Sequence, residues 1–392
     1  MEEAKDSLEK WIFWRITNLF NYDLSLIFYD LTSSYFEGNG PSSARYGYSR
    51  DHRPDLKQIQ IGLLVNPDGI PISHMVFNGA ISDQKTLPSI IYEMTKKFNI
   101  KRCIFVADDG ILTGATIREI KSAGYESILS VGMHKEKWVD NIIKDLPKVD
   151  TWQKIKDNLW IYAYPGLIDG FRIVAVFNYK RKEAQKRKRD EHIQESIDYL
   201  SSFNQQTKRG AQKDNKKVER QIERFLKHKG TKKFFTFNRK GSYNLVYNTC
   251  DGVIKSYEAK DGIMLLRSDA KTLTPEQIAM GYETLVKVED ATSLLKHLIK
   301  IRPIRHYNDE RVKGHVAVCV LAYLLEAHLE TLLEQSKVNL TARKAISKLK
   351  SLTCVEFNLE GHTILKTVPP TQEQIDILKS VGLEKFERNI CK

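Results

Sequence analysis

The chain has 392 residues, 41% of them hydrophobic, and it carries 62 Lys and Arg against 49 Asp and Glu, a net charge of +13. This length fits two or three domains, or one domain with a large insertion, and the apolar content provides ample material for a core. Its five cysteines form no C-x-x-C pair, which excludes a typical zinc site or disulfide framework. The positive excess favours a polyanionic partner, most simply nucleic acid, although ribosome-associated and membrane-surface proteins carry similar charge.

The sequence also argues against export and against membrane insertion. The first apolar cluster, 11–14, is interrupted at once by Arg15, so it does not resemble a signal peptide. The longest apolar run, 316–325, is shorter than the roughly 20 residues that a membrane span needs. We interpret it as part of a buried helix at 315–335. Reduced thiols in a cytosolic protein are then expected.

An amphipathic helix is predicted at 1–20, and a strand buried on both faces at 24–36. Asp30 lies in the middle of this strand, on the same face as Leu26 and Phe28. Burying an isolated carboxylate is costly, so Asp30 is either paired or holds a metal ion, unless the strand opens to solvent there. Both alternatives are consistent with the sequence.

Strands and helices then alternate over the first third of the chain. After a Gly- and Arg-rich loop at 38–55, strands are predicted at 58–65, 70–77, 101–108 and 126–131, with helices at 86–98 and 116–123. The strand at 101–108 is a short apolar run that ends in Asp108. Functional sites in open α/β sheets form at the carboxyl ends of strands, so Asp108 is a second candidate site residue.

The character of the sequence changes over 133–275, which we interpret as a large α+β insertion. Strands are predicted there at 159–164, 171–179, 242–247 and 262–267. A very basic tract runs from Lys180 to Lys233, with helical spacing of its Glu and Lys residues. Solvated helix faces or a surface for a polyanion would both give this pattern.

A third acid lies in the segment Tyr282–Lys296, where Glu289 has Tyr282 seven residues before it and Lys296 seven residues after it. Seven residues of α-helix turn through about 700°, so the three side chains would project from nearly one face. A carboxylate beside a cation and a phenol can bind a metal ion and a phosphate together. A solvated polar stripe on an ordinary helix would have the same spacing.

Asp30, Asp108 and Glu289 together suit a site for two Mg²⁺ ions. Magnesium prefers oxygen ligands and often takes only a few carboxylates together with a substrate phosphate. Two such ions, about 3.5–4 Å apart, can activate a water molecule and stabilise the leaving oxygen in phosphodiester cleavage. Mn²⁺ can substitute for Mg²⁺ at such a site.

At these positions the sequence resembles the DDE transposases of bacterial insertion sequences, in the group with a Y-R-E-K signature. Tyr282, Glu289 and Lys296 occupy the places of the signature's Tyr, Glu and Lys. The resemblance covers roughly 24–330, and its further motifs are Y-D-L-T-S-S-Y-F-E-G at 29–38, Y-G-Y-S-R-D-H-R-P-D at 46–55, V-A-D-D-G at 106–110 and R-P-I-R-H at 302–306.

This resemblance implies an α/β fold with a ribonuclease-H-like mixed sheet and flanking helices. The catalytic core would consist of 21–132 and 276–335, interrupted by the insertion subdomain at 133–275. An N-terminal helical remnant at 1–20 and a C-terminal extension at 336–392 would complete the chain.

The resemblance also implies a reaction and its residues. Asp30 would bridge both metal ions, while Asp108 and Glu289 would each hold one. Tyr282, Lys296, Arg302 and His306 are the implied DNA-binding residues. The enzyme would cleave double-stranded DNA at the terminal inverted repeats of a mobile element and transfer the freed 3′-hydroxyl to target DNA, acting as a homodimer on paired ends.

Three departures from the family pattern leave other functions open. The signature's Arg is replaced by Leu285, an aromatic-Arg pair by Thr292-Ser293, and a basic residue by Asp109. The chain also begins almost at the first catalytic strand, as in a truncated copy. A catalytically impaired DNA-binding remnant or regulator, or a general nuclease on the same core, therefore remains an alternative.

Overall fold

The structure is a computed structural model, and the residues it describes are 5–19, 26–101, 103–108, 114–207, 215–240, 244–285, 301, 303–359, 362–383 and 389–391. The chain divides into two compact units. Unit 1 consists of Met1–Ile128 and Met280–Lys392, and unit 2 consists of Leu129–Ala279. For comparison, the insertion is predicted at 133–275, and unit 1 also includes the predicted N-terminal remnant and C-terminal extension.

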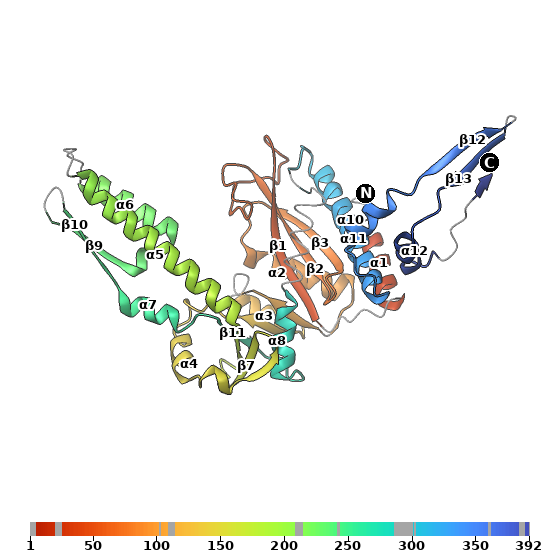
Figure 1. The fold of residues 1–392 in the computed structure, drawn as a ribbon. Coiled ribbons are helices and arrows are strands. Elements are labelled where there is room, and N and C mark those ends of the chain that lie inside the picture. The colour runs from red at the N-terminus through yellow and green to blue at the C-terminus, as the bar shows by residue number, and fades with distance from the viewer. Residues whose placement is uncertain are drawn as a thin grey trace. The chain divides into compact units, whose positions relative to one another are not determined.

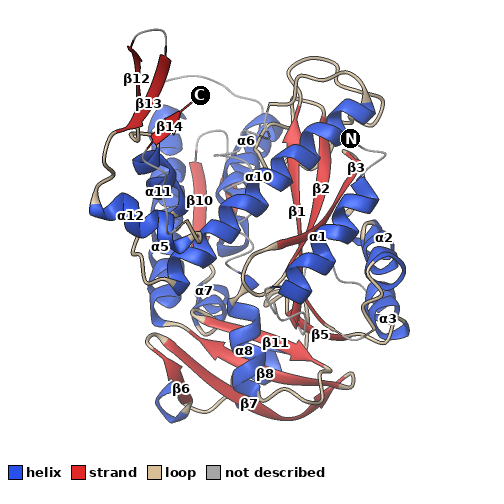
Figure 2. Cartoon of the chain, turned by 90° about the vertical axis from the view of Figure 1, so that its right-hand side faces the viewer, coloured by secondary structure: helices blue, strands red, loops and turns tan. Residues whose placement is uncertain are grey.

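A mixed sheet with helices beside it forms the centre of unit 1 (Figures 1 and 2). Its elements are α1 (Lys5–Leu19), β1 (Leu26–Tyr35), β2 (Gln58–Val65), β3 (Pro71–Asn78), α2 (Leu87–Tyr92), β4 (Ile104–Ala107), α3 (Gly114–Ser122) and β5 (Glu126–Ser130). The strand order is β3-β2-β1-β4-β5; β1 is antiparallel to β2 and parallel to β4. This arrangement confirms the α/β class with a mixed sheet and flanking helices, as in a ribonuclease-H-like fold.

Every strand and helix predicted before residue 132 is present, with ends that differ by a few residues. The helix predicted at 86–98 differs in type: its first part is α2, and it continues as a π-helical turn, Glu93–Lys97. One face of the sheet carries Tyr29, Leu31 and Phe105, which pack on apolar residues of α2 and α3. The hydroxyl of Tyr29 donates a hydrogen bond to Thr86 Oγ1 at 2.8 Å, so this buried phenol is satisfied.

The apolar run at 316–325 lies in α10 (Asp309–Gln335), which packs against β3. Val316, Val320 and Tyr323 are buried, and the Tyr323 hydroxyl donates to Gly69 O at 2.7 Å. Among the described helices, α10 is the one that is long and apolar enough to qualify as a membrane span. That is weak evidence, because a core helix meets the same criterion. The helix contacts β3, but only 33% of its apolar window is buried, so the prediction of a buried helix at 315–335 is confirmed only in part.

The C-terminal residues of unit 1 form elements that the sequence did not predict. They are α11 (Ala342–Leu349), β12 (Cys354–Leu359), β13 (His362–Thr367), α12 (Gln372–Ser380) and β14 (Asn389–Cys391). The strands form a sheet of their own in the order β12-β13-β14. The two helices pack on the end of α10 through Leu333, Ala345 and Ile377.

Unit 2 contains a sheet and a helical arm. Its elements are α4 (Val139–Asp145), β6 (Gln153–Lys156), β7 (Leu159–Ile168), β8 (Phe171–Phe177), α5 (Tyr179–Thr207), α6 (Asn215–Lys229), β9 (Phe235–Lys240), β10 (Asn244–Thr249), α7 (Asp251–Glu258) and β11 (Ile263–Ser268). The sheet has the order β11-β8-β7-β6, and one core cluster packs it against α4. A second cluster joins α5, α6, α7 and the β9–β10 hairpin, so the basic tract belongs to a folded body.

Gly62 in β2 is a position where the core has no room for a side chain. A Cβ there would lie 2.8 Å from the Tyr29 hydroxyl and 3.0 Å from Phe77 Cε2. We therefore expect Gly62→Ala to lower the free energy of unfolding by about 1–3 kcal/mol, measured by urea denaturation. The control is Gly314→Ala in α10, where no atom lies within 4 Å of the added Cβ; it should gain about 0.5–1 kcal/mol. Equal unfolding midpoints for the two variants would contradict this packing.

Candidate functional site

Two of the three predicted acids belong to neighbouring parallel strands, Asp30 within β1 and Asp108 directly after the end of β4. In the register of β1 with β4, Phe28 pairs with Val106. Continuing that register by two residues brings Asp30 opposite Asp108, at a strand spacing of about 4.8 Å. Side chains alternate along a strand, so both carboxylates lie on the sheet face opposite to Tyr29 and Phe105. The pairing of β1 with β4 therefore determines that these two side chains are close.

The surroundings of Asp30 combine a fixed backbone with an accessible side chain. Residues 27–29 and 31–34 of β1 are buried, whereas Asp30 is half-buried. Its Oδ1 accepts a hydrogen bond from its neighbour Leu31 N at 2.8 Å. On the β2 side, Asp30 pairs with Leu63 in mid-strand; on the other side, β4 ends at Ala107 and is followed by the exposed Asp108. Asp30 is therefore a partly exposed position in an otherwise buried stretch of β1.

A third candidate residue, Tyr282 in α8 (Pro275–Glu283), contacts one of the two aspartates. Its hydroxyl donates a hydrogen bond to Asp108 Oδ1 at 3.3 Å. The neighbouring Gly281 allows the close approach of this helix, since a Cβ there would lie 3.2 Å from Ile128 Cδ1 and 3.4 Å from Leu26 Cδ1. Leu26 shares its strand face with Asp30, so the end of α8 packs on the face that carries the acids.

Of the helix predicted at 282–296, the structure describes only 282–285, and there Tyr282, Glu283 and Leu285 are helical while Thr284 is a turn residue whose N still donates to Met280 O at 3.1 Å. Tyr282 lies in the last turn of α8, which begins at Pro275 and ends at Glu283, and a turn follows at Thr284. Glu289 and Lys296 lie outside the described residues, so their common face with Tyr282 stays a prediction. Leu285, at the place of the signature's Arg, is 5% exposed and packs in the core.

The segment of R-P-I-R-H borders a different part of β1. The Ser34 hydroxyl donates to Ile301 O at 3.0 Å, and Ile304 N donates to Tyr35 O at 3.1 Å. Tyr35 lies five residues beyond Asp30, about 16 Å along the strand. His306, the last residue of this segment, is half-buried, and its ring centroid lies 5.5 Å from that of His315 in α10. It therefore contacts α10 rather than the two aspartates, and Arg302 lies outside the described residues.

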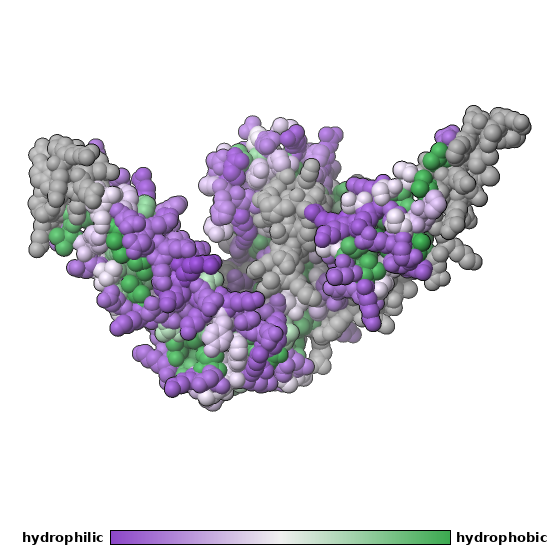
Figure 3. All heavy atoms as spheres, viewed as in Figure 1, coloured by the Kyte–Doolittle hydropathy of each residue, from purple (hydrophilic) through white to green (hydrophobic). Residues whose placement is uncertain are grey.

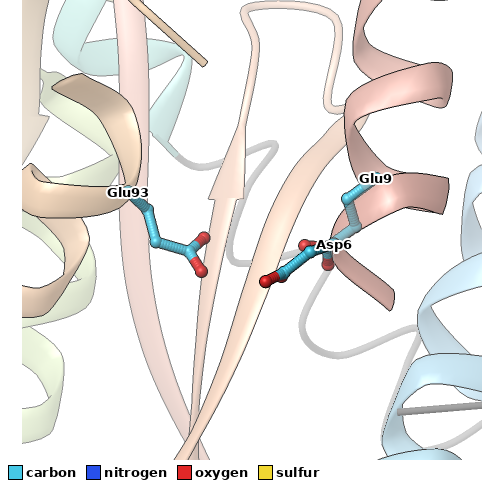
Figure 4. A group of neighbouring side chains, drawn as sticks. All are labelled: Asp6, Glu9 and Glu93. Carbon is cyan, nitrogen blue, oxygen red and sulfur yellow. The ribbon is translucent and has the colours of Figure 1, made fainter. Parts of the chain in front are cut away.

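A second group of acids is present that the sequence did not indicate. The carboxylates of Asp6 and Glu9 on α1 and of Glu93 after α2 point toward one another (Figure 4), with oxygens within 4.8 Å. Lys97 Nζ lies among them, 2.8 Å from Asp6 Oδ1 and 3.5 Å from Glu93 Oε1, and it also contacts Glu9 Oε2. An ammonium group thus already balances these carboxylates, so we interpret the group as structural.

The same group joins α1 to β3. Glu9 Oε1 lies 2.8 Å from His74 Nδ1, and Lys5 Nζ donates to His74 O at 2.9 Å. Burial by itself raises the pKa of Glu9, but the hydrogen bond to His74 and the charges of His74, Lys5 and Lys97 outweigh it and lower that pKa to about 2. No short motif links residues of α1 with Glu93 and Lys97, which is why sequence reasoning could not find the group.

Comparison with known proteins gives one family and a distant structure. The sequence matches the family described as "Transposase DDE domain" over residues 21–325, a range that includes every candidate site residue named above. None of the curated proteins compared with the chain matches it. Among solved structures it is similar to a piggyBac transposase in a synaptic complex with hairpin DNA, with a TM-score of 0.41 and 7% sequence identity. The likeness covers 97% of this chain and 58% of that chain.

The depressed pKa of Glu9 predicts a loss of stability in acid. Its folded-state pKa of about 2 lies below the value of about 4.3 for an exposed Glu. The stabilisation is therefore complete above about pH 4.3 and is lost as the pH falls toward 2, an effect of about 3 kcal/mol. Urea unfolding from pH 6 to pH 2.5 should show a flatter profile for Glu9→Gln. The exposed Glu136→Gln variant should follow the parent protein, and parallel profiles for all three proteins would contradict the prediction.

Proposed function

This chain belongs to the family described as Transposase DDE domain, and from that premise we propose that it cleaves DNA at the ends of a mobile element and joins the freed 3′-hydroxyl to target DNA, using divalent metal ions. The observation that supports this proposal most is the parallel pairing of β1 with β4, because Asp30 lies in β1 and Asp108 directly follows β4, both inside the matched region. The proposed partners are double-stranded DNA, as terminal inverted repeats and as target, and a second copy of the chain on paired ends.

The two aspartates fit a site for Mg²⁺ or Mn²⁺. Both offer hard carboxylate oxygens on one face, next to a strand end, and neither is sealed from solvent. We propose Glu289 as the third ligand. When bound, the ions supply Lewis-acid activation of the attacking hydroxyl and stabilisation of the leaving oxygen. Both carboxylates are proposed to bind the same metal ions, so the loss of either should lower the cleavage rate nearly as much as the loss of both.

The remaining residues are proposed to position the acids and the DNA. The hydrogen bond from Tyr282 restrains Asp108, which comes directly after the end of β4. Partners that orient a metal ligand in this way commonly contribute 10-fold or more to metal affinity. Lys296 and Arg302 are proposed to contact DNA phosphates. His306 is proposed to contact DNA farther along β1, away from the aspartates.

One observation favours a second candidate function, a DNA-binding regulator with impaired catalysis. The place of the signature's Arg is occupied by Leu285, whose side chain is 5% exposed. A buried leucine cannot supply the charged phosphate contact that an arginine makes. The two functions differ in whether cleavage accompanies binding, so one set of assays separates them.

We expect Asp30→Asn, Asp108→Asn and the double variant each to lose at least about 100-fold in cleavage rate, because each removes a charged metal ligand. The assay combines the full chain, duplex DNA with the inverted repeats that flank its gene, and Mg²⁺; the product is a nick with a 3′-hydroxyl at the end boundary. Asp68→Asn, an exposed turn residue, is the control and should leave the rate unchanged.

Binding of the same DNA should survive in all these variants. Binding without nicking by the unmodified chain would favour the regulator, and digestion without regard to the end sequence would favour a general nuclease. Cleavage that persists in Asp30→Asn would overturn the assignment of the site.

Tyr282→Phe separates two roles for the phenol. If the hydroxyl holds Asp108, the Mg²⁺ concentration for half-maximal cleavage should rise about 10-fold while the DNA dissociation constant stays within about twofold. If the hydroxyl instead contacts a DNA phosphate, the dissociation constant should rise and the Mg²⁺ midpoint should stay. We expect the first result, because the Tyr282 hydroxyl donates a hydrogen bond to Asp108 Oδ1.

A further inference from the structure

The net charge of the chain is concentrated in one folded segment. Residues 179–240, from the start of α5 to the end of β9, contain 20 Lys and Arg against 8 Asp and Glu, a net charge of +12. The whole chain carries +13, so all other residues together contribute +1. A positive excess spread evenly over a surface serves solubility, whereas an excess confined to one arm indicates a local task.

Within that segment, α6 presents a continuous basic face. Lys217, Arg220, Arg224 and Lys227 recur every three or four residues and are all exposed. At 100° per residue these four cations fall within one quarter of the helix circumference, and His228 lies beside them. From Lys217 to Lys227 the helix rises about 15 Å, so the face is a row of cations rather than a single charge.

The opposite face of α6 is buried, which fixes the direction of the basic face. Val218, Ile222 and Leu226 are at most 1% exposed and pack with residues of α5, β9, β10 and α7. The helix therefore has no freedom to turn its cations inward. Hydrophilic residues cover much of the visible surface of α5 and α6 (Figure 3).

Neighbouring acids do not neutralise this row. At the start of α5, by contrast, Arg189 is buried in contacts with Asp261 and Glu258. On α6, Glu223 lies at the border of the basic face and pairs with Lys232 at 2.8 Å. Among the residues that the structure describes, none of the ion pairs involves Lys217, Arg220, Arg224 or Lys227. Their charge is directed at solvent or at a partner.

We propose that this face of α6 binds the sugar-phosphate backbone of double-stranded DNA without reading its bases. The proposal rests on the proposed function and adds a binding surface in unit 2, separate from the residues proposed to do chemistry. DNA presents a dense row of negative charge that matches a row of cations, and contacts to phosphates carry no sequence information. An anionic membrane fits less well, because membrane-surface helices insert their apolar face and that of α6 is occupied.

The test replaces Lys217, Arg220, Arg224 and Lys227 with Gln in the full chain and measures binding to a random-sequence 40-base-pair duplex in EDTA. Each lost phosphate contact lowers the slope of log K against log salt by about 0.9, so we expect the slope to fall by about 3 and affinity at 0.1 M salt to fall at least about tenfold. The pair Arg220→Gln and Arg224→Gln alone should lower the slope about half as much.

The matched control replaces Lys137, Lys144, Lys148 and Lys154 with Gln. These cations are exposed in the same unit, and their segment, 135–157, is nearly balanced with six Lys and five Asp or Glu. The control loses the same total charge, so an equal loss of affinity in both quadruple variants would overturn the proposal in favour of net charge alone. An unchanged slope in the α6 variant, with an unchanged urea midpoint, would also overturn it.

The same variants separate this surface from its nearest competitor and from the catalytic proposal. If the α6 variant binds vesicles with anionic lipid more weakly than the unmodified chain does, but binds DNA equally well, the face serves a membrane and the proposal fails. Because the DNA assay contains no metal ion, it is independent of cleavage. Loss of DNA binding in the α6 variant would therefore stand even if the unmodified chain never cut an element end.

Discussion

The parallel pairing of β1 with β4 is the constraint on which the candidate site depends. Asp30 and Asp108 are far apart in the sequence, and only the register that pairs Phe28 with Val106 brings them to one level of the sheet. A shift of that register by one residue would turn one carboxylate to the face occupied by Tyr29 and Phe105. The apolar packing of that face therefore fixes the position of the acids on the other.

The sequence predicted those parts of the fold that local pattern determines. Runs such as I-F-V-A in β4 are apolar throughout because both faces are buried, and such runs identify central strands with ends correct to a few residues. The helix predicted from the spacing of Tyr282, Glu289 and Lys296 rests on ideal helix geometry, which takes no account of tertiary packing, and the structure describes only 282–285 of it, with one turn residue at Thr284. The contacts of Lys97 with its three carboxylates could not be predicted for the same reason, since these residues come together only when α1 packs against β3.

The proposed metal-dependent chemistry and the proposed DNA binding would make opposite electrostatic demands on this chain. A site built from carboxylates has to attract cations, and a strongly positive surrounding field would compete with that attraction. Nearly all of the positive excess lies instead in the helical arm of unit 2, outside the part of the chain that holds Asp30 and Asp108. This partition explains how one basic protein can carry an acidic centre, because the charge average over 392 residues describes neither part.

The docking of α1 has a consequence for the solubility of the protein. β3 is the outermost strand of its sheet, and such a strand offers unpaired backbone groups to which a strand of another molecule can add. Here the ammonium of Lys5 donates a hydrogen bond to the backbone carbonyl of His74. The buried contacts of Glu9 with His74 and Lys97 hold α1 against the strand. The helix thus satisfies one carbonyl of this outermost strand, and loss of its contacts would leave that backbone group available to a strand of another molecule.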